Sequence, residues 1–193
     1  MVAILAGLLL QTNVVVLENE YVRVTRDAAP CAAAAAPQCG DRVIVALGNV
    51  RLNRAGALVS LRRGEIAVFT AGQAHGIPSG ERYFEVAIKP DHPSPKRPAE
   101  HIPPDKNAVL YDSDRLFIFE ERLAVGDTRE RHSHRQRVVI QLNRTKLQQW
   151  PDGESEVIRD IVPDTAAFNA PVIHRVKNVG ELPLRGIVIE LKK

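Results

Sequence analysis

The sequence predicts an all-β fold made of two copies of one unit. Short runs rich in Val, Ile and Leu are separated by turn residues at intervals of roughly 8 to 12 positions, a spacing typical of sandwiches and barrels. No convincing amphipathic helix is longer than three turns. Strand-like runs of the first half recur in the second half, which indicates an internal duplication. At 193 residues, the chain can bury a core as one large domain or two small ones.

The first ten residues, Met1 to Leu10, are almost wholly apolar. They are too few to span a bilayer as a helix. They are similar to the apolar region of a signal peptide, although no Lys or Arg precedes them and no A-x-A site follows. A buried N-terminal strand is the other interpretation, and the sequence leaves both open.

The only two cysteines, Cys31 and Cys39, flank an alanine-rich run. A pair this close in sequence can close a loop as a disulfide, which requires an oxidising compartment. The alternative is two buried thiols, or a loop pair without a role. Together with the apolar N-terminus, the pair favours an extracytoplasmic (periplasmic or secreted) location over a cytoplasmic one.

The expected strands follow the duplication in order. The main runs are 21–25, 42–47, 65–69, 116–123 and 184–191. The run Arg42–Leu47 matches Arg137–Leu142 at an offset of 95 residues, and 85–89 matches 188–192 at 103. Between them, Phe69 matches Phe168 and His75 matches His174 at an offset of 99. Growing offsets indicate small insertions in loops. We expect both phenylalanines to lie in a barrel core.

A proline-rich stretch separates the two copies. Six of the thirteen prolines lie from Pro90 to Pro104, where no apolar periodicity is visible, and this indicates an extended linker. The sequence therefore predicts an N-terminal unit at 14–90, a linker at 91–106 and a C-terminal unit at 107–193. In the second unit, Trp150-Pro-Asp-Gly153 is expected to form a turn.

Composition excludes several classes of function. Apolar residues make up 45% and charged residues 25% of the chain, as in an ordinary soluble globular protein. The net charge is only +3, and basic residues are interleaved with acidic ones. Because no arginine-rich arm, RNA-binding aromatic motif or helix-turn-helix pattern is visible, we expect no nucleic-acid partner. We also expect no membrane span, since the apolar stretch at the N-terminus is too short for one.

Three histidines form a candidate metal site. His132 and His134 stand two apart on an extended segment, so that their side chains share one face, and His174 comes from a distant strand. Three imidazoles can hold a divalent transition metal. On a regular strand, Glu130 and Gln136 would share the histidine face, and Arg129, Arg131, Arg135 and Arg137 would form a basic opposite face. The alternative is a solvated edge strand whose histidines are merely polar.

The spacing around these histidines resembles the cupin superfamily. Gly126-x5-His132-x-His134 is similar to the first cupin motif, G-x5-H-x-H-x3-4-E-x6-G. The second motif, G-x5-P-x-G-x2-H-x3-N, is matched by 163–178, with His174 and Asn178, and by 64–79, with His75. The resemblance covers nearly the whole chain. It implies a bicupin of two tandem jelly-roll β-barrels, with His132, His134 and His174 converging inside the second.

The chain departs from the cupin pattern at defined positions. The metal-binding glutamate of the family would fall at Val138 or Val139, and neither side chain can be a ligand. Three neutral histidines suit Zn, Fe, Ni or Cu better than Mn. In the first barrel, Cys39 and Pro37 occupy the positions of the two motif-1 histidines, so that His75 stands alone. We expect a packed or hydrogen-bonded His75 in a structural barrel that has lost its metal motif.

Two classes of function follow from the resemblance. One is a small-molecule oxygenase or isomerase with a three-histidine metal centre in the C-terminal barrel, in which Glu130 is the only nearby carboxylate of the expected parity. The alternative is a non-catalytic ligand-binding or structural module. Both allow a small-molecule ligand and a homodimer, and no residues for an organic cofactor are predicted. Whether the chain is an enzyme stays open, because function depends on the site and not on the fold.

Overall fold

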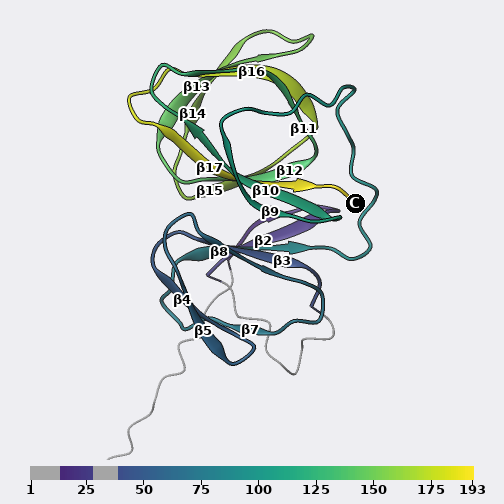
Figure 1. Ribbon diagram of the computed structural model, residues 1–193, viewed down its shortest axis with the longest axis vertical. Coiled ribbons are helices and arrows are strands. Elements are labelled where there is room, and N and C mark those ends of the chain that lie inside the picture. Colours follow the sequence, from purple (N-terminus) through teal and green to yellow (C-terminus); the bar gives the residue numbers. More distant parts are fainter. Residues whose placement is uncertain (1–13, 28–38) are drawn as a thin grey trace, which may run out of the picture.

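The computed structural model describes residues 14–27 and 39–193. Every regular element in these residues is a β-strand, so the all-β prediction is confirmed. The strands form two stacked units, and the chain passes from one to the other along one side of the molecule (Figure 1). Each of the five predicted runs coincides with a strand to within one residue.

The first unit combines a five-stranded and a three-stranded antiparallel sheet. Their strand orders are β1-β2-β8-β3-β6 and β5-β4-β7. The strands are β1 (Val14–Glu18), β2 (Val22–Arg26), β3 (Arg42–Ala46), β4 (Val50–Arg54), β5 (Ala57–Leu61), β6 (Ile66–Phe69), β7 (His75–Gly76) and β8 (Tyr83–Ile88). A separate core that includes Ile44, Leu52 and Phe69 fills the space inside this unit.

The second unit repeats this plan with longer strands. Its sheets have the orders β15-β12-β17-β10-β9 and β11-β16-β13-β14. The strands are β9 (Asn107–Asp112), β10 (Leu116–Leu123), β11 (Thr128–His134), β12 (Arg137–Gln141), β13 (Thr145–Pro151), β14 (Val157–Ile161), β15 (Thr165–Asn169), β16 (Val172–Asn178) and β17 (Leu184–Leu191). The equivalent strands of the two units agree with the predicted duplication.

The largest apolar core lies between the two units. Their five-stranded sheets face each other in the middle of the molecule (Figure 1). Because side chains alternate across a strand, one face of each sheet packs against the other unit and the opposite face points into its own barrel. On β3, Val43 and Val45 join the shared core, and on β12, Val138 and Ile140 do so. All four are fully buried.

The strand pairing corrects one part of the predicted repeat. Arg42 on β3 is paired with Phe69, and its equivalent on β12, Arg137, is paired with Asn169. Phe69 therefore corresponds to Asn169, and the prediction that aligned it with Phe168 is wrong by one residue. A shift of one residue moves a side chain to the other face of the sheet. Phe168 consequently packs in the core between the units, stacked on Tyr21 at 5.4 Å between ring centroids.

The proline-rich segment lies along the second unit. No strand or helix occurs from 91 to 106. The backbone nitrogen of Ser133 donates to the carbonyl oxygen of Ile102 at 2.9 Å, and the Ile102 nitrogen donates back to the Ser133 hydroxyl at 2.8 Å. The Lys96 nitrogen donates to the Gln136 side chain at 2.6 Å. We propose 14–90 and 107–193 as the barrels and 91–106 as the linker that is fastened to β11.

Two predictions concern residues outside the described ranges. Met1 to Leu10 and Cys31 lie there, so the signal-peptide and strand interpretations and the Cys31–Cys39 disulfide stay predictions. Within the described part of the chain, no helix has the length and apolar character needed to cross a membrane.

Candidate metal centre

The three predicted histidines meet inside the second barrel. Strands β11 and β16 pair antiparallel, with His132 directly opposite His174. His134 follows two residues along β11 and points to the same side. One ligand nitrogen from each ring lies within 4.8 Å of the other two, and all three residues are buried. The structure thus brings together the set of side chains that the sequence singles out.

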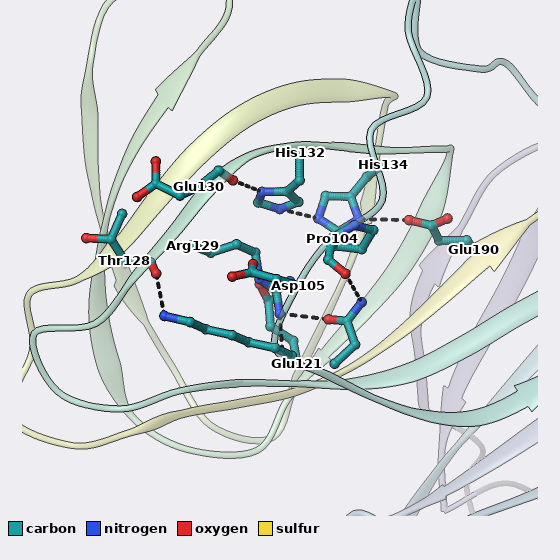
Figure 2. A network of polar contacts seen from close by, with 11 residues as sticks. Pro104, Asp105, Glu121, Thr128, Arg129, Glu130, His132, His134 and Glu190 are labelled. Carbon is teal, nitrogen blue, oxygen red and sulfur yellow. Dashed lines mark hydrogen bonds and ion pairs between the residues drawn. The ribbon is translucent and has the colours of Figure 1, made fainter.

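The imidazole rings are oriented by acceptors on their outer sides. His132 Nδ1 donates to the carbonyl oxygen of Glu130 at 2.7 Å, so its Nε2 atom carries a lone pair. His134 Nδ1 lies 2.7 Å from a carboxylate oxygen of Glu190. The two Nε2 atoms are 3.0 Å apart and point toward each other (Figure 2). A carboxylate on the outer nitrogen of a metal-bound histidine is a common arrangement, since it fixes the tautomer and raises ligand basicity.

His174 completes the group with an unsatisfied nitrogen. Its Nε2 atom is buried and has no hydrogen-bond partner among the described residues. Burial is the main cause that lowers the pKa of His174 to about 2 and that of His132 to about 4, and it also holds the pKa of His134 well below its usual value. All three imidazoles are therefore neutral at neutral pH, as metal ligation requires.

A β-bulge in β11 overturns the predicted basic face. The pairing of β11 with β16 shifts between Arg129 and His132, so that two residues of β11 stand against one of β16. Arg129 therefore faces the interior with His132 and is fully buried, while Glu130 is exposed. The prediction that Glu130 shares the histidine face is wrong for this reason. A general base at Glu130 has no support in this geometry.

Buried Arg129 belongs to a network behind the histidines (Figure 2). Its Nη1 donates to the Glu121 carboxylate at 2.9 Å, and its Nη2 donates to Asn107 Oδ1 at 2.7 Å and to the Lys106 carbonyl oxygen at 2.9 Å. Glu121 thus provides a counterion for a guanidinium that is buried beside His132. The network ties β9 and β10 to the base of β11.

Arg137 also lies inside the barrel, against the prediction. It begins β12, after the short break that follows His134, and only 7% of its surface is exposed. Nη1 donates to the carbonyl oxygens of Ala170 at 2.8 Å and Arg135 at 3.2 Å. Burial lowers the pKa of Arg137 to about 10, which still leaves the guanidinium charged at neutral pH.

Other predicted positions have structural roles. Val138 packs between the barrels and Val139 lines the interior, so neither position supplies the carboxylate that the cupin pattern places there. Gln136 bonds to the linker through Lys96. Asn178 is fully buried and donates to the Leu123 and Leu182 carbonyl oxygens, as expected for a structural residue.

Glu190 is a site residue that sequence reasoning missed. It lies on β17, opposite Arg137 on β12, and burial raises its pKa to about 7 while the charge of Arg137 opposes the rise. A signal was present in the sequence, because Glu190 is the single carboxylate in the otherwise apolar run Ile187–Leu191. Buried carboxylates are rare unless they have a partner or a function.

A cavity of about 480 Å³ adjoins the histidines. His134 and His174 form part of its wall. The remaining wall combines apolar and polar side chains, among them Val139, Leu147, Ile161, Val176 and Val188, and Arg137, Gln141, Gln149, Thr165 and Asn169. This volume lies in the range of small-molecule sites, roughly 300–1,000 Å³.

The donor set fits a divalent transition metal. Two nitrogen ligands at ~2.0–2.1 Å from one ion are about 3 Å apart when the angle between them is near 90°, and the two Nε2 atoms of His132 and His134 are 3.0 Å apart. An ion there would also satisfy the orphaned nitrogen of His174. Neutral imidazoles without a carboxylate ligand suit Zn, Fe, Ni or Cu.

The first barrel places His75 in a different setting. The ring stacks on Phe69 at 4.7 Å between centroids, and Nε2 lies 3.2 Å from a Glu85 carboxylate oxygen. His75 is thus packed and hydrogen-bonded, as the sequence predicts. In the linker, His101 is exposed and His92 is half-buried.

Comparison with known proteins identifies the fold. No protein-family model and no curated protein matches the chain. Among solved structures, it is similar to a cupin 2 conserved barrel domain protein from Leptotrichia buccalis, with a TM-score of 0.56 and 15% identity over 93% of this chain and 88% of that one. It is also similar to AerE from Microcystis aeruginosa, with a TM-score of 0.58 and 15% identity over 94% and 97% of the two chains.

A third similar structure is the Lactobacillus farciminis oxalate decarboxylase formate complex. The TM-score is 0.59, with 10% identity over 91% of this chain and 78% of that one. These likenesses run through both units and agree with the motif resemblance and the strand pairing. The chain therefore has the cupin fold, built as two tandem jelly-roll β-barrels.

Proposed function

We propose that the chain is a metal-binding bicupin whose C-terminal barrel holds one divalent transition metal on His132, His134 and His174. The observation that supports this most strongly is the convergence of three buried, neutral imidazoles, two of them held by acceptors on their outer nitrogens. Without a cation, the buried Nε2 atom of His174 would remain unsatisfied, at a cost of roughly 1–3 kcal/mol.

The adjoining cavity supports a small-molecule ligand. A metal in this position would supply Lewis-acid chemistry, or redox chemistry if it is iron, copper or nickel, toward a ligand in the cavity. The residues of the chain would bind and orient that ligand: Val139 and Val188 form an apolar wall, and Arg137 and Asn169 present polar groups. An oxygenase or isomerase is the enzyme class that fits this arrangement.

A non-catalytic ligand-binding module is the second candidate. It is favoured by the state of Glu121, a carboxylate of the cavity wall, and of Glu190, which contacts His134. Glu121 is bonded to Arg129, and Glu190 is bonded to His134, so neither is free to act as a general base. A substrate screen on the metal-loaded protein separates the two candidates, because a binder would retain its ligand unchanged.

Elemental analysis of the untagged protein tests the metal centre. We expect about one metal ion per chain in the wild type and in His101→Ala, which removes an exposed linker histidine. The double variant His132→Ala/His134→Ala should hold none. Equal metal content in the double variant and the wild type would overturn the proposed site.

A further inference from the structure

The buried guanidinium of Arg137 lies in the second barrel and has no part in the proposed metal site. Both of its hydrogen bonds are made by Nη1 to backbone carbonyl oxygens. The side chain forms no ion pair with any described residue, and the carboxylates of Glu190 and Glu121 act on it only from a distance. A buried cation without a direct counterion is costly unless a ligand supplies the charge.

The equivalent arginine of the first barrel shows what is special about Arg137. Arg42 holds the same register position, and it too donates to a backbone carbonyl oxygen, that of Gln73, just before the motif-2 histidine. Bracing this loop is therefore a shared structural role. The surroundings differ, because Phe69 and His75 fill the first barrel beside Arg42, whereas Asn169 replaces Phe69 in the second barrel and a cavity is present.

The free edge of the guanidinium is open only in the second barrel. In Arg42, the Nε and Nη1 atoms are buried and have no hydrogen-bond partner among the described residues. In Arg137, Nε and Nη2 also lack a hydrogen-bond partner there, but neither atom is fully buried. With Nη1 bonded to the backbone, Nε and Nη2 of Arg137 remain as a pair of parallel donors beside the cavity. This edge matches the two oxygens of a carboxylate in a bidentate pair.

The charge around the cavity has the same sign. The charged side chains of the cavity wall are Arg137, Arg159, Glu121, Glu154 and Asp160, and Arg129 and Glu190 are bonded to wall residues. Together with a divalent ion, and with all four carboxylates ionised, these groups leave one positive charge. Part of the wall is apolar, with Val139 and Val188 in the row next to Arg137. A ligand with one anionic end and an apolar body would complement both features.

We infer that the cavity takes a small organic carboxylate, whose carboxylate group pairs with Arg137 beside the three-histidine centre. This inference rests on the proposed metal function and names the class of ligand for the same site. Arg137 serves as the recognition residue, and its contacts to Ala170 and Arg135 hold the guanidinium in place for that role.

Binding of matched acids and amides to the zinc-loaded protein tests the inference. We would measure the dissociation constants of acetate and benzoate, and of acetamide and benzamide as neutral analogues of the same shape, by calorimetry. The wild type should bind the acids at least about tenfold more tightly than the amides, since hydrogen bonds to charged groups are the stronger ones. Inorganic phosphate, a tetrahedral anion, should bind more weakly than benzoate.

Three variants make the test specific. Arg137→Gln should reduce the preference for acids strongly, because only the charge of the ion then favours them. Arg137→Lys, which keeps the charge but loses the two-pronged edge, should lie between Arg137→Gln and the wild type. Arg42→Gln makes the same change at the equivalent place in the first barrel and should keep the full preference. Circular dichroism and zinc content would be measured for each variant, so that a folding defect is recognised.

The outcomes separate the two claims. If the wild type binds neither zinc nor iron, nickel or copper, the proposed function fails and the inference falls with it. If zinc binds but acids and amides bind equally, or Arg137→Gln and Arg42→Gln behave alike, the metal site stands and the carboxylate inference is overturned. Equal, Arg137-dependent binding of phosphate and benzoate would also overturn it, because the site would then recognise anions in general.

Discussion

At the scale of single residues, His134 carries the most connections in the site. Its ring touches the Glu190 carboxylate on one side and His132 on the other, and its face stacks at 6.0 Å from Phe119. The imidazole is therefore fixed in direction before any ligand arrives. A ring that is already fixed loses less conformational entropy when it binds a metal. The contribution of Glu190 to this orientation can be tested directly.

Replacing Glu190 should weaken metal binding without abolishing it. In Glu190→Gln the acceptor for His134 Nδ1 loses its charge, and loss of such outer partners typically lowers metal affinity about 10- to 100-fold. Competition with a chromophoric chelator would measure the dissociation constant. Glu85→Gln, which alters the contact to His75 in the first barrel, is the matched control and should leave affinity unchanged. Unchanged affinity in Glu190→Gln would contradict the role of Glu190.

The buried histidines also predict how the metal-free protein responds to acid. Their folded pKa values lie below 6.5, so acid protonates them first in the unfolded chain, and stability falls as the pH drops below 6.5. The raised pKa of Glu190, about 7, acts in the opposite direction between pH 7 and 4.5, but it is one group against three. We expect a net loss of roughly 1–3 kcal/mol per pH unit between pH 6.5 and 5.

Urea unfolding in the presence of a chelator would measure this dependence. His174→Gln removes one of the three histidines and should reduce the slope of stability against pH by about one proton, or ~1.4 kcal/mol per pH unit. All surface carboxylates are common to the two proteins and cancel in the comparison. Identical slopes would show that His174 titrates normally in the folded protein.

At the scale of elements, strand β11 shows both the reach and the limit of sequence reasoning. Alternation places His132 and His134 on one face, and the motif spacing from Gly126 marks the segment that carries them. The bulge between Arg129 and His132 is not encoded by alternation, because it depends on pairing with β16. The prediction for Phe168 is wrong for a related reason, because its face depends on pairing with β12. In contrast, the turn at Asp152–Gly153 follows from local chemistry: Gly153 has φ 74°, as predicted for a glycine there.

Deleting Arg131 tests what the bulge does. The deletion would let β11 pair regularly with β16 and still keep Arg129 and His132 on the inner face, because they would then stand two apart. His132 would lose its two-residue link to the Glu130 carbonyl oxygen, which orients the ring. We expect a folded protein whose metal affinity is about 10-fold lower or worse.

Arg131→Ala is the control for this deletion. It removes the same exposed side chain and its surface ion pairs with Asp152 and Glu100, which are worth little, but it keeps the bulge. Metal affinity in the control should equal that of the wild type. If the deletion and the substitution bind metal alike, the bulge has no part in orienting His132.

At the scale of the whole molecule, the two barrels share their largest core. In the described part of the chain, seventeen buried residues in or next to the strands of both five-stranded sheets form one continuous apolar cluster between the units. The duplication and the strands were predictable, since each depends on local pattern and repeat. The packing of one barrel on the other was not, because a strand buried on both faces gives no signal of which partner covers which face. We expect the two barrels to unfold together.

The single tryptophan makes this expectation measurable. Trp150 lies in the second barrel, whereas Phe84 on β8 of the first barrel is fully buried in the shared core. Phe84→Ala should cost ~3–5 kcal/mol and lower the urea midpoint seen by Trp150 fluorescence. Leu58→Ala, at a side chain that is 70% exposed in the first barrel, should leave the midpoint unchanged. An unchanged Trp150 midpoint in Phe84→Ala would mean that the barrels unfold separately.

Strand β12 has a consequence for how this protein can evolve. Arg137, Val139 and Gln141 line the cavity, whereas Val138 and Ile140, which alternate with them, belong to the core between the barrels. Under the proposed function, side chains that would contact a ligand therefore alternate along this strand with side chains that hold the two barrels together. Substitutions at 137, 139 and 141 would alter the cavity while Val138 and Ile140 keep the two barrels packed together. A change of ligand along this strand would therefore not require an unstable intermediate.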